Sequence, residues 1–272
     1  MSSTSKTHSI LKKIKRLFMG FALAYAITCF VIYLFQEKLI FFPEKLAHSY
    51  QFKFDRPFDE YQIPMHDGVL LNLLHFKADS CRGAVLHFHG NAGSNRTWGE
   101  RAELFTSIGY DFFVYDYRGF GKSEGKISQE DQLIADAETV YQFVESKITA
   151  AKISIEGFSI GSGIAVQIAA KHPIHQLILL APYQSLTALM GHKFPFLPSF
   201  LLKYPLASED YFEQISAPIT LFHGTADETI PLENSTELSK HFKAGDRLIV
   251  VEEMTHNGLP YSRTYLDYLA RF

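Results

Sequence analysis

Apolar and polar positions alternate in blocks along this chain, and most blocks predict a strand or a helix. Short apolar runs bounded by turn residues predict buried strands at 84–89, 112–116, 152–156, 176–180, 219–223 and 247–251. Apolar residues at every third or fourth position predict helices at 97–107, 129–147, 162–171, 233–242 and 261–271. Strands that alternate with helices are typical of a mostly parallel sheet covered on both faces, so we expect an α/β fold.

Two segments depart from this alternation. Residues 58–64 and 69–76 flank the turn His66-Asp67-Gly68, which predicts a hairpin ahead of the parallel strands. Residues 183–211 are rich in proline and aromatic residues and interrupt the regular pattern.

The N-terminal segment has the hydrophobic pattern of a membrane span. Residues 17–35 are nineteen residues without a charge, and as a helix they would extend about 28 Å, close to the thickness of the hydrocarbon core of a bilayer. A basic cluster precedes them, consisting of Lys12, Lys13, Lys15 and Arg16. The positive-inside rule therefore places residues 1–16 in the cytosol and residues 36–272 on the other side of the membrane.

Two other interpretations of the apolar run remain open. A cleaved signal peptide has an apolar core of about 7–15 residues followed by a small-residue cleavage site, whereas the segment 36–43 offers no such site. A helix in the core of the protein is disfavoured because the run is apolar on all its faces. We expect a single transmembrane helix over 17–35 that anchors the protein in a lipid bilayer.

Composition narrows the remaining possibilities. The chain of 272 residues is 47% hydrophobic, enough for one sizeable domain over 36–272. A net charge of −3 gives no electrostatic reason to expect a nucleic-acid partner. Cys29 and Cys81 are the only cysteines, and no Cys/His cluster has the spacing of metal ligands, so we expect neither a metal nor a cofactor.

The motif Gly157-Phe158-Ser159-Ile160-Gly161 lies between a predicted strand and a predicted helix. A serine at such a sharp turn matches a nucleophile elbow, in which the hydroxyl is exposed at the strand end. The flanking glycines are expected because neighbouring backbone approaches the turn too closely for a Cβ atom. We therefore take Ser159 as the candidate nucleophile.

A serine nucleophile needs a histidine base, and the histidine needs a carboxylate that orients it. In folds that carry a nucleophile elbow the three follow the order serine, acid, histidine, each at the C-terminal end of a strand. Asp227 follows the strand 219–223 and His256 follows the strand 247–251. Glu228, the neighbour of Asp227, is the alternative acid.

The negative charge that develops on the substrate requires two preorganised N–H donors. The backbone of Ile160, directly after the nucleophile, is one candidate. The second is expected in the glycine-rich loop 89–94, where we favour the backbone N–H of Asn91, with Ala92 as the alternative.

Four motifs together carry a resemblance to a known family. They are His89-Gly90-Asn91-Ala92-Gly93, the run 116–125 (Asp-Tyr-Arg-Gly-Phe-Gly-Lys-Ser-Glu-Gly), the elbow 157–161 and His223-Gly224-Thr225-Ala226-Asp227. The set resembles the serine-aminopeptidase-like branch of the α/β-hydrolase superfamily, and within it the membrane-anchored subfamily that includes the eukaryotic protein depalmitoylases. Members of that subfamily open with one hydrophobic helix and a stretch like Leu39-Ile40-Phe41-Phe42-Pro43.

The resemblance implies the α/β-hydrolase fold with a small lid over about 183–211, although a loop packed on the flank of the sheet is an equal alternative. It assigns Ser159, Asp227 and His256 to catalysis and the backbones of Asn91 and Ile160 to the oxyanion hole. Asp116 and Arg118 are expected to brace their loop.

The expected function is that of a membrane-anchored serine hydrolase that cleaves a small acyl ester or thioester. Two alternatives stay open. One is a serine peptidase of the aminopeptidase type, which would need an acidic group to hold the free amine of its substrate. The other is a non-catalytic binding protein that retains the fold.

Overall fold

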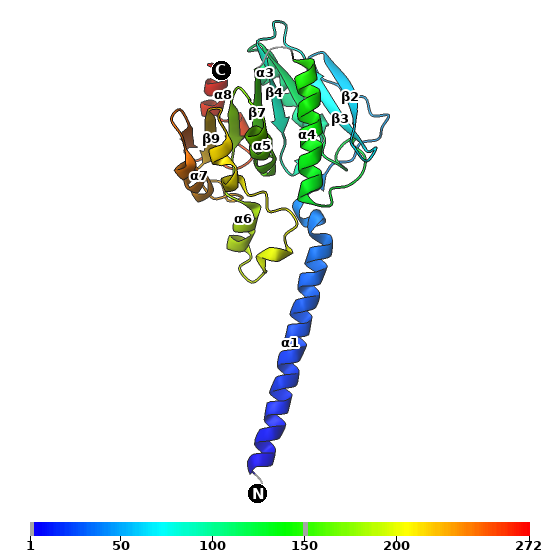
Figure 1. Cartoon of the computed structure of the whole chain (residues 1–272), viewed down its shortest axis with the longest axis vertical. Coiled ribbons are helices and arrows are strands. Elements are labelled where there is room, and N and C mark those ends of the chain that lie inside the picture. Colours follow the sequence, from blue (N-terminus) through cyan, green and yellow to red (C-terminus); the bar gives the residue numbers. More distant parts are fainter. Residues whose placement is uncertain (1–2, 149–151) are drawn as a thin grey trace.

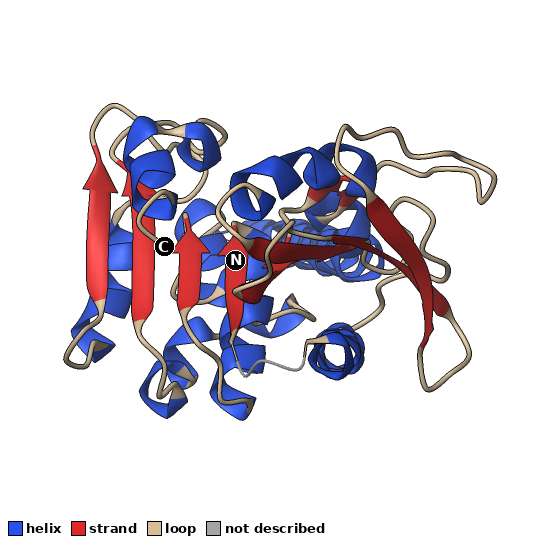
Figure 2. Ribbon diagram, turned by 90° about the horizontal axis from the view of Figure 1, so that it is seen from above, coloured by secondary structure: helices blue, strands red, loops and turns tan. Residues whose placement is uncertain are grey.

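An eight-stranded sheet forms the centre of the protein in the computed structural model, which describes residues 3–148 and 152–272 (Figure 2). The strand order is β10-β9-β8-β7-β4-β6-β3-β2. Neighbouring strands from β10 to β6 pair in parallel, and β3 and β2 extend the sheet antiparallel. The mostly parallel sheet that the sequence predicts is therefore confirmed.

The strand bounds agree with the predicted ones to within two residues. The parallel strands are β4 (Gly83–Phe88), β6 (Tyr110–Tyr115), β7 (Ile153–Phe158), β8 (Leu177–Leu180), β9 (Ile219–Gly224) and β10 (Arg247–Val251). The predicted hairpin is also confirmed, because β2 (Phe58–Pro64) pairs antiparallel with β3 (Leu70–Phe76).

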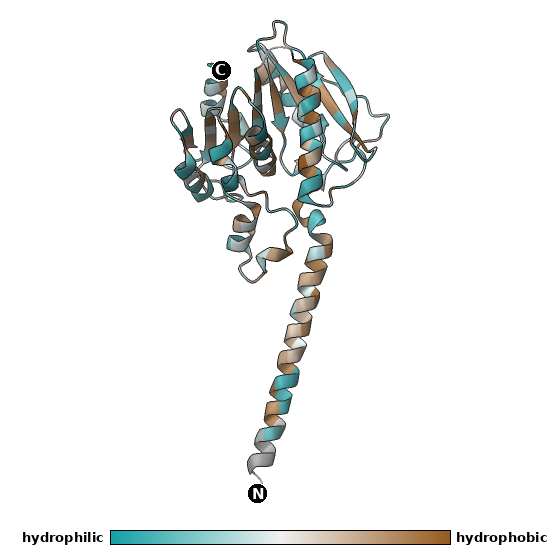
Figure 3. Cartoon of the chain, in the orientation of Figure 1, coloured by the Kyte–Doolittle hydropathy of each residue, from teal (hydrophilic) through white to brown (hydrophobic). Residues whose placement is uncertain are grey.

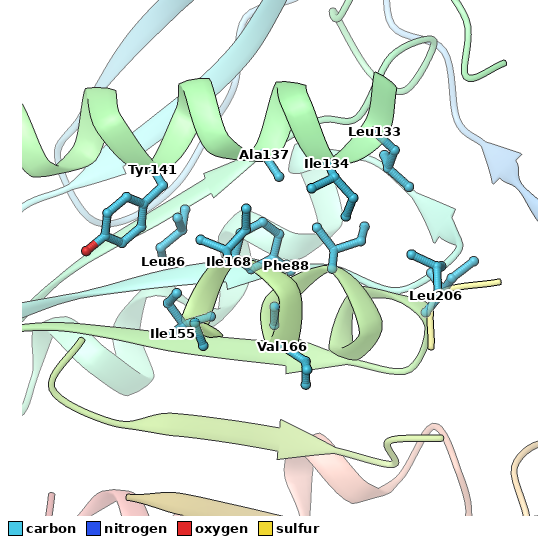
Figure 4. Packing of buried hydrophobic residues seen from close by; sticks show 14 of the residues in the cluster. Leu86, Phe88, Leu133, Ile134, Ala137, Tyr141, Ile155, Val166, Ile168 and Leu206 are labelled. Carbon is cyan, nitrogen blue, oxygen red and sulfur yellow. The ribbon is translucent and has the colours of Figure 1, made fainter. Parts of the chain in front are cut away.

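Helices cover both faces of the sheet because side chains of alternate strand residues point to opposite faces. On β4, Leu86 and Phe88 join the core under α4 (Glu130–Lys147) and α5 (Ile160–Lys171), as Figure 4 shows. Val85 joins the opposite core, which α3 (Ala102–Thr106) and α8 (Arg263–Leu269) cover. A further helix, α7 (Glu233–Leu238), follows β9.

The predicted helix 97–107 is wrong as a single element. Residues of this segment form α2 (Asn95–Trp98), a 3₁₀ turn (Gly99–Arg101) and α3. The start is fixed by Ser94, whose side chain accepts the backbone N–H of Arg96. The break coincides with Gly99, where a Cβ atom would lie 2.5 Å from the Phe54 ring, so tertiary packing decides the local geometry.

Helix α1 (Ser3–Ile40) is longer at both ends than the predicted span and projects from the domain as a stalk (Figure 1). Its residues 17–35 are uncharged and largely apolar, a basic cluster lies toward the N-terminus (Figure 3), and Lys38 lies in its last turn. Within the described residues, one helix is long and apolar enough to cross a membrane, Ile10–Ile40, and its apolar window is not buried in the protein. The interpretation as a core helix is therefore wrong.

The end of α1 is joined directly to the domain. Strand β1 (Phe42–Pro43) pairs in parallel with β5 (Ala92–Gly93) in the glycine-rich loop after β4. The next residue, Glu44, donates its N–H to Gly93 and accepts the N–H of Gly121. The segment 183–211 contains α6 (Leu186–Lys193) and short 3₁₀ turns at Ser199–Leu201 and Ser208–Asp210. The part of this segment around α6 projects from the domain on the same side as α1 (Figure 1).

Candidate active site

Ser159 occupies the turn between β7 and α5, with φ 53° and ψ −125°, a conformation that L-residues rarely adopt. The turn is tight: a Cβ on Gly161 would lie 2.1 Å from the Phe88 carbonyl oxygen, and one on Gly157 would lie 2.7 Å from the Ser162 Cα. The Ser162 hydroxyl donates to the Ser159 carbonyl at 2.6 Å and holds the turn. Both glycines are thus required for the reason that the sequence indicated.

The structure brings the three expected side chains together. His256 Nε2 lies 3.0 Å from Ser159 Oγ, and His256 Nδ1 lies 2.7 Å from Asp227 Oδ2. Ser159 comes from the end of β7, whereas Asp227 and His256 come from the loops after β9 and β10. All three residues are buried. This is the geometry in which a histidine removes the proton of a serine hydroxyl.

Asp227 is held as a carboxylate. Burial opposes its ionisation, but hydrogen bonds from His256 and from the backbone of Ile230 outweigh burial and lower the pKa of Asp227 below its ordinary value. The backbone N–H groups of Thr229 and Ile230 both donate to its Oδ1 at 2.8 Å. Glu228 is exposed, and His256 is bonded to its neighbour Asp227.

The two expected oxyanion donors lie at the same cavity as Ser159, since Asn91 and Ile160 both line it. Helix α5 begins at Ile160, so the N–H of Ile160 has no acceptor within its helix and is free to face a developing negative charge. Asn91 is fixed from α1: its Nδ2 donates to the Ile40 carbonyl at 2.9 Å, and its own carbonyl accepts the Phe42 N–H at 2.8 Å.

His89 packs against the loop 89–94 that contains Asn91. Its Nδ1–H donates to the Gly90 carbonyl at 2.6 Å, and its ring lies against the Tyr117 ring with centroids 4.0 Å apart. Burial lowers the pKa of His89 to about 3. The side chain is therefore a neutral packing element, and it does not act as a base.

Asp116 and Arg118 brace the next loop, as the resemblance implies. Asp116 accepts the Asn95 N–H at 2.7 Å. Arg118 is bonded at 2.6 Å to both Asp67 and Asp136, so it joins the hairpin turn to α4.

A buried ionic cluster under the elbow was missed by the sequence analysis. Glu156, three residues before Ser159, contacts Arg101 at 2.7 Å, His87 at 2.5 Å and the Tyr265 hydroxyl. Burial opposes the ionisation of Glu156, but Arg101 and His87 outweigh it and hold its pKa at about 2. The sequence signal was a glutamate inside a strand that is apolar except for Ser154.

A cavity of about 650 Å³ extends from Ser159 between the segment 183–211, for which a lid was expected, and α1. Its lining is mostly aliphatic and aromatic and includes neither Asp nor Glu among the described residues. Helix α1 contributes Ile32, Gln36, Leu39 and Ile40 to the lining. Expected from the sequence only as an anchor, α1 also lines the cavity, and the polar Gln36 and Glu37 at the end of its apolar run were the sequence signal of this second role.

The chain resembles known proteins in sequence. Residues 79–208 match the serine aminopeptidase family S33. An uncharacterized protein of Mycobacterium tuberculosis is 30% identical over 219 residues, which cover 77% of each chain. The chain belongs to the α/β-hydrolase superfamily, and the family comparison supports a hydrolase.

Other relatives extend this comparison. Lysophosphatidylserine lipase ABHD12 of Danio rerio is 28% identical over 181 residues, which cover 58% of this chain and 47% of the lipase. The fold is similar to that of an esterase from Pyrococcus furiosus, with a TM-score of 0.67 and 20% identity over 85% of this chain and 96% of the esterase. The α/β-hydrolase fold expected from the sequence is thus confirmed.

Proposed function

We propose that the protein is a membrane-anchored serine hydrolase that cleaves carboxylic ester or thioester bonds through an acyl-enzyme. The observation that carries this proposal is the hydrogen-bonded series Ser159–His256–Asp227 at the inner end of an apolar cavity. A non-catalytic protein would have no need of a serine held in a strained turn against an oriented histidine.

In the first half of the reaction, Ser159 Oγ attacks the carbonyl carbon of the substrate while His256 Nε2 takes the hydroxyl proton. Asp227 stabilises the imidazolium that forms. The carbonyl oxygen becomes an oxyanion, which the N–H groups of Ile160 and Asn91 would bind. The bond to the leaving alcohol or thiol then breaks, and His256 delivers its proton to that group.

In the second half, water replaces the alcohol or thiol. His256 takes a proton from the water, the hydroxide attacks the acyl carbon, and the carboxylic acid leaves as Ser159 regains its proton. The same base and the same oxyanion donors therefore serve both steps.

The cavity lining favours an acyl substrate over a peptide with a free amine. A peptidase that releases N-terminal residues needs a carboxylate near the scissile bond to hold the charged amine. The described lining offers none, whereas its aliphatic and aromatic side chains suit a hydrocarbon chain.

Membrane anchoring is part of the proposal. The length and apolarity of Ile10–Ile40 and the basic cluster before residue 17 support a single span with the N-terminus in the cytosol. The catalytic domain would then face the non-cytosolic side.

The test is labelling of the full-length protein in detergent with a fluorophosphonate probe, with the Ser159→Ala variant as the control. We expect labelling of the wild type only. Turnover of p-nitrophenyl acyl esters should exceed that of aminoacyl anilides. An unlabelled, folded wild type would exclude a serine hydrolase, and preferred turnover of the anilides would exclude an esterase.

A further inference from the structure

The lid segment runs along α1 and is bonded to it at both ends. At the lower end, the Tyr25 hydroxyl donates to the Phe196 carbonyl at 2.6 Å. At the upper end, Gln36 Nε2 donates to the Leu201 carbonyl at 2.9 Å, and Gln36 Oε1 accepts the Lys203 N–H at 2.9 Å. The lid is therefore aligned with twelve residues of the helix, from Tyr25 to Gln36.

This alignment fixes the depth of the lid relative to any bilayer that α1 crosses. The hydrocarbon core of a bilayer is about 30 Å thick. Tyr25 lies only about 12 Å along the helix axis from Leu17, where the uncharged run begins, and about 22 Å from Ile10, where the candidate span begins. A bilayer that covers a full span of α1 must therefore extend past Tyr25. The lid apex at Phe196 then lies within the hydrocarbon layer.

The lid apex, residues 194–202, has the composition for this position. Its sequence, Phe-Pro-Phe-Leu-Pro-Ser-Phe-Leu-Leu, contains no charged residue, and Lys193 and Lys203 flank it. The Phe196 residue is 63% exposed and Phe200 is 81% exposed. In water, two such phenylalanines beside an apolar helix would form an exposed hydrophobic patch. In a bilayer, lipid acyl chains would cover that patch.

More than half of the backbone N–H groups of the lid apex have acceptors, which favours immersion in hydrocarbon. Pro195 and Pro198 have no N–H group to satisfy. The N–H groups of Leu197, Leu201 and Leu202 donate to carbonyls within the apex itself. Two apex carbonyls accept from the side chains of α1, as described above.

The cavity connects this depth with the nucleophile. Its lining includes Phe196 and Leu197 of the lid and Ile32 of α1, which lies between the levels of Tyr25 and Gln36, and it ends at Ser159 and Ile160. The two walls at its outer end are thus the lid and the membrane-spanning helix.

We propose that the lid apex inserts into the non-cytosolic leaflet beside α1, and that the acyl chain of a lipid in that leaflet enters the cavity sideways, between α1 and the lid. The leaflet lipid is the occupant because it surrounds both walls wherever α1 crosses the bilayer. The entry route rests on the proposed hydrolase activity, whereas the insertion rests on the lid–α1 contacts and on the proposed membrane span of α1.

Insertion is tested without any activity measurement. Full-length Phe200→Trp protein is reconstituted into phosphatidylcholine vesicles whose acyl chains either carry bromine or do not. Bromine quenches the fluorescence of a tryptophan that lies within the hydrocarbon layer. The matched control is Ser80→Trp, an exposed loop position at the opposite, N-terminal edge of the parallel strands. We expect the added fluorescence to be quenched in Phe200→Trp and unquenched in Ser80→Trp. Equal, weak quenching of both would overturn the insertion.

Entry from the leaflet is tested with Phe200→Asp, since Phe200 is outside the described cavity lining. Turnover of a fluorogenic lysophospholipid ester embedded in vesicles should fall about tenfold or more, because a charge at this depth disfavours insertion. Turnover of p-nitrophenyl acetate should match the wild type, and Ser80→Asp should match it on both substrates. Equal vesicle turnover by Phe200→Asp and wild type would overturn the entry route.

Two further results separate the hypotheses. Wild type that hydrolyses an S-acylated peptide in the same vesicles but not the lipid ester would overturn the lipid as the occupant. Wild type that is inactive even on p-nitrophenyl acetate would refute the proposed function, while the quenching result would still decide insertion.

Discussion

The side-chain amide of Asn91 donates to the main-chain carbonyl of Ile40, with 2.9 Å between the two atoms. One residue belongs to the loop that carries an expected oxyanion donor, and the other ends the helix proposed to cross the membrane. The bond orders a loop whose donor must be in place before the reaction starts. Helix α1 therefore helps to shape the site in addition to its proposed role as a membrane anchor.

Ser159→Ala should abolish ester hydrolysis without unfolding the protein, because the hydroxyl lies at the cavity and fills no core position. We expect kcat for a p-nitrophenyl ester to fall by at least about a thousandfold. Thermal unfolding should stay close to that of the wild type. Retention of more than a tenth of the activity would show that another residue is the nucleophile.

Asp227→Asn should depress kcat and leave KM near normal, because an amide favours the wrong tautomer of His256. A fall of about 10⁴-fold is the scale expected for this change. Glu228→Gln is the matched control and should have little effect, since Glu228 is exposed. A larger loss of kcat in Glu228→Gln than in Asp227→Asn would show that Glu228 is the catalytic acid.

Arg101→Met should destabilise the fold, because it leaves the buried carboxylate of Glu156 without its cation. Removing one partner of a buried ion pair costs about 3–5 kcal/mol. Arg263→Ala, which breaks the exposed pair with Asp267, is the control and should leave the unfolding midpoint unchanged. The measurement is urea unfolding in detergent, and equal midpoints for the two variants would contradict a structural role of the cluster.

His89 should make stability depend on pH. The unfolded chain takes up a proton near the ordinary pKa of 6.5, whereas the folded protein resists protonation until about pH 3. The stability contributed by neutral His89 is thus complete above 6.5 and is lost as pH falls toward 3, by up to about 1.4 kcal/mol per pH unit. The difference between wild type and His89→Gln in the free energy of unfolding should shrink from pH 7 to pH 4, and a constant difference would refute this account.

The basic cluster before the span should determine the topology. A reporter that is active only outside the cytosol, fused to the C-terminus, should be active. Replacing Lys12, Lys13, Lys15 and Arg16 together by glutamine should reduce that activity and produce molecules of inverted orientation. A C-terminal reporter that is active only in the cytosol would reverse the proposed orientation.

Local chemistry explains why much of the protein was predictable. The elbow at Ser159 depends on two glycines and on the adjoining strand and helix, all within a short stretch of sequence. Asp227 and His256 could be chosen from order alone, because parallel strands bring their C-terminal ends to one edge of the sheet. The apolar run at the N-terminus was visible because it is apolar on every face, as the proposed membrane span requires.

Tertiary structure decided the features that depend on distant partners. Glu156 gained Arg101 and His87 only when strands and helices packed. The Phe54 ring lies against Gly99, where the predicted helix gives way to a 3₁₀ turn. In the same way, α1 became a wall of the cavity through contacts with the segment 183–211, more than 160 residues away along the chain. Periodicity reports which face of an element is apolar, but the identity of what covers that face is set by packing alone.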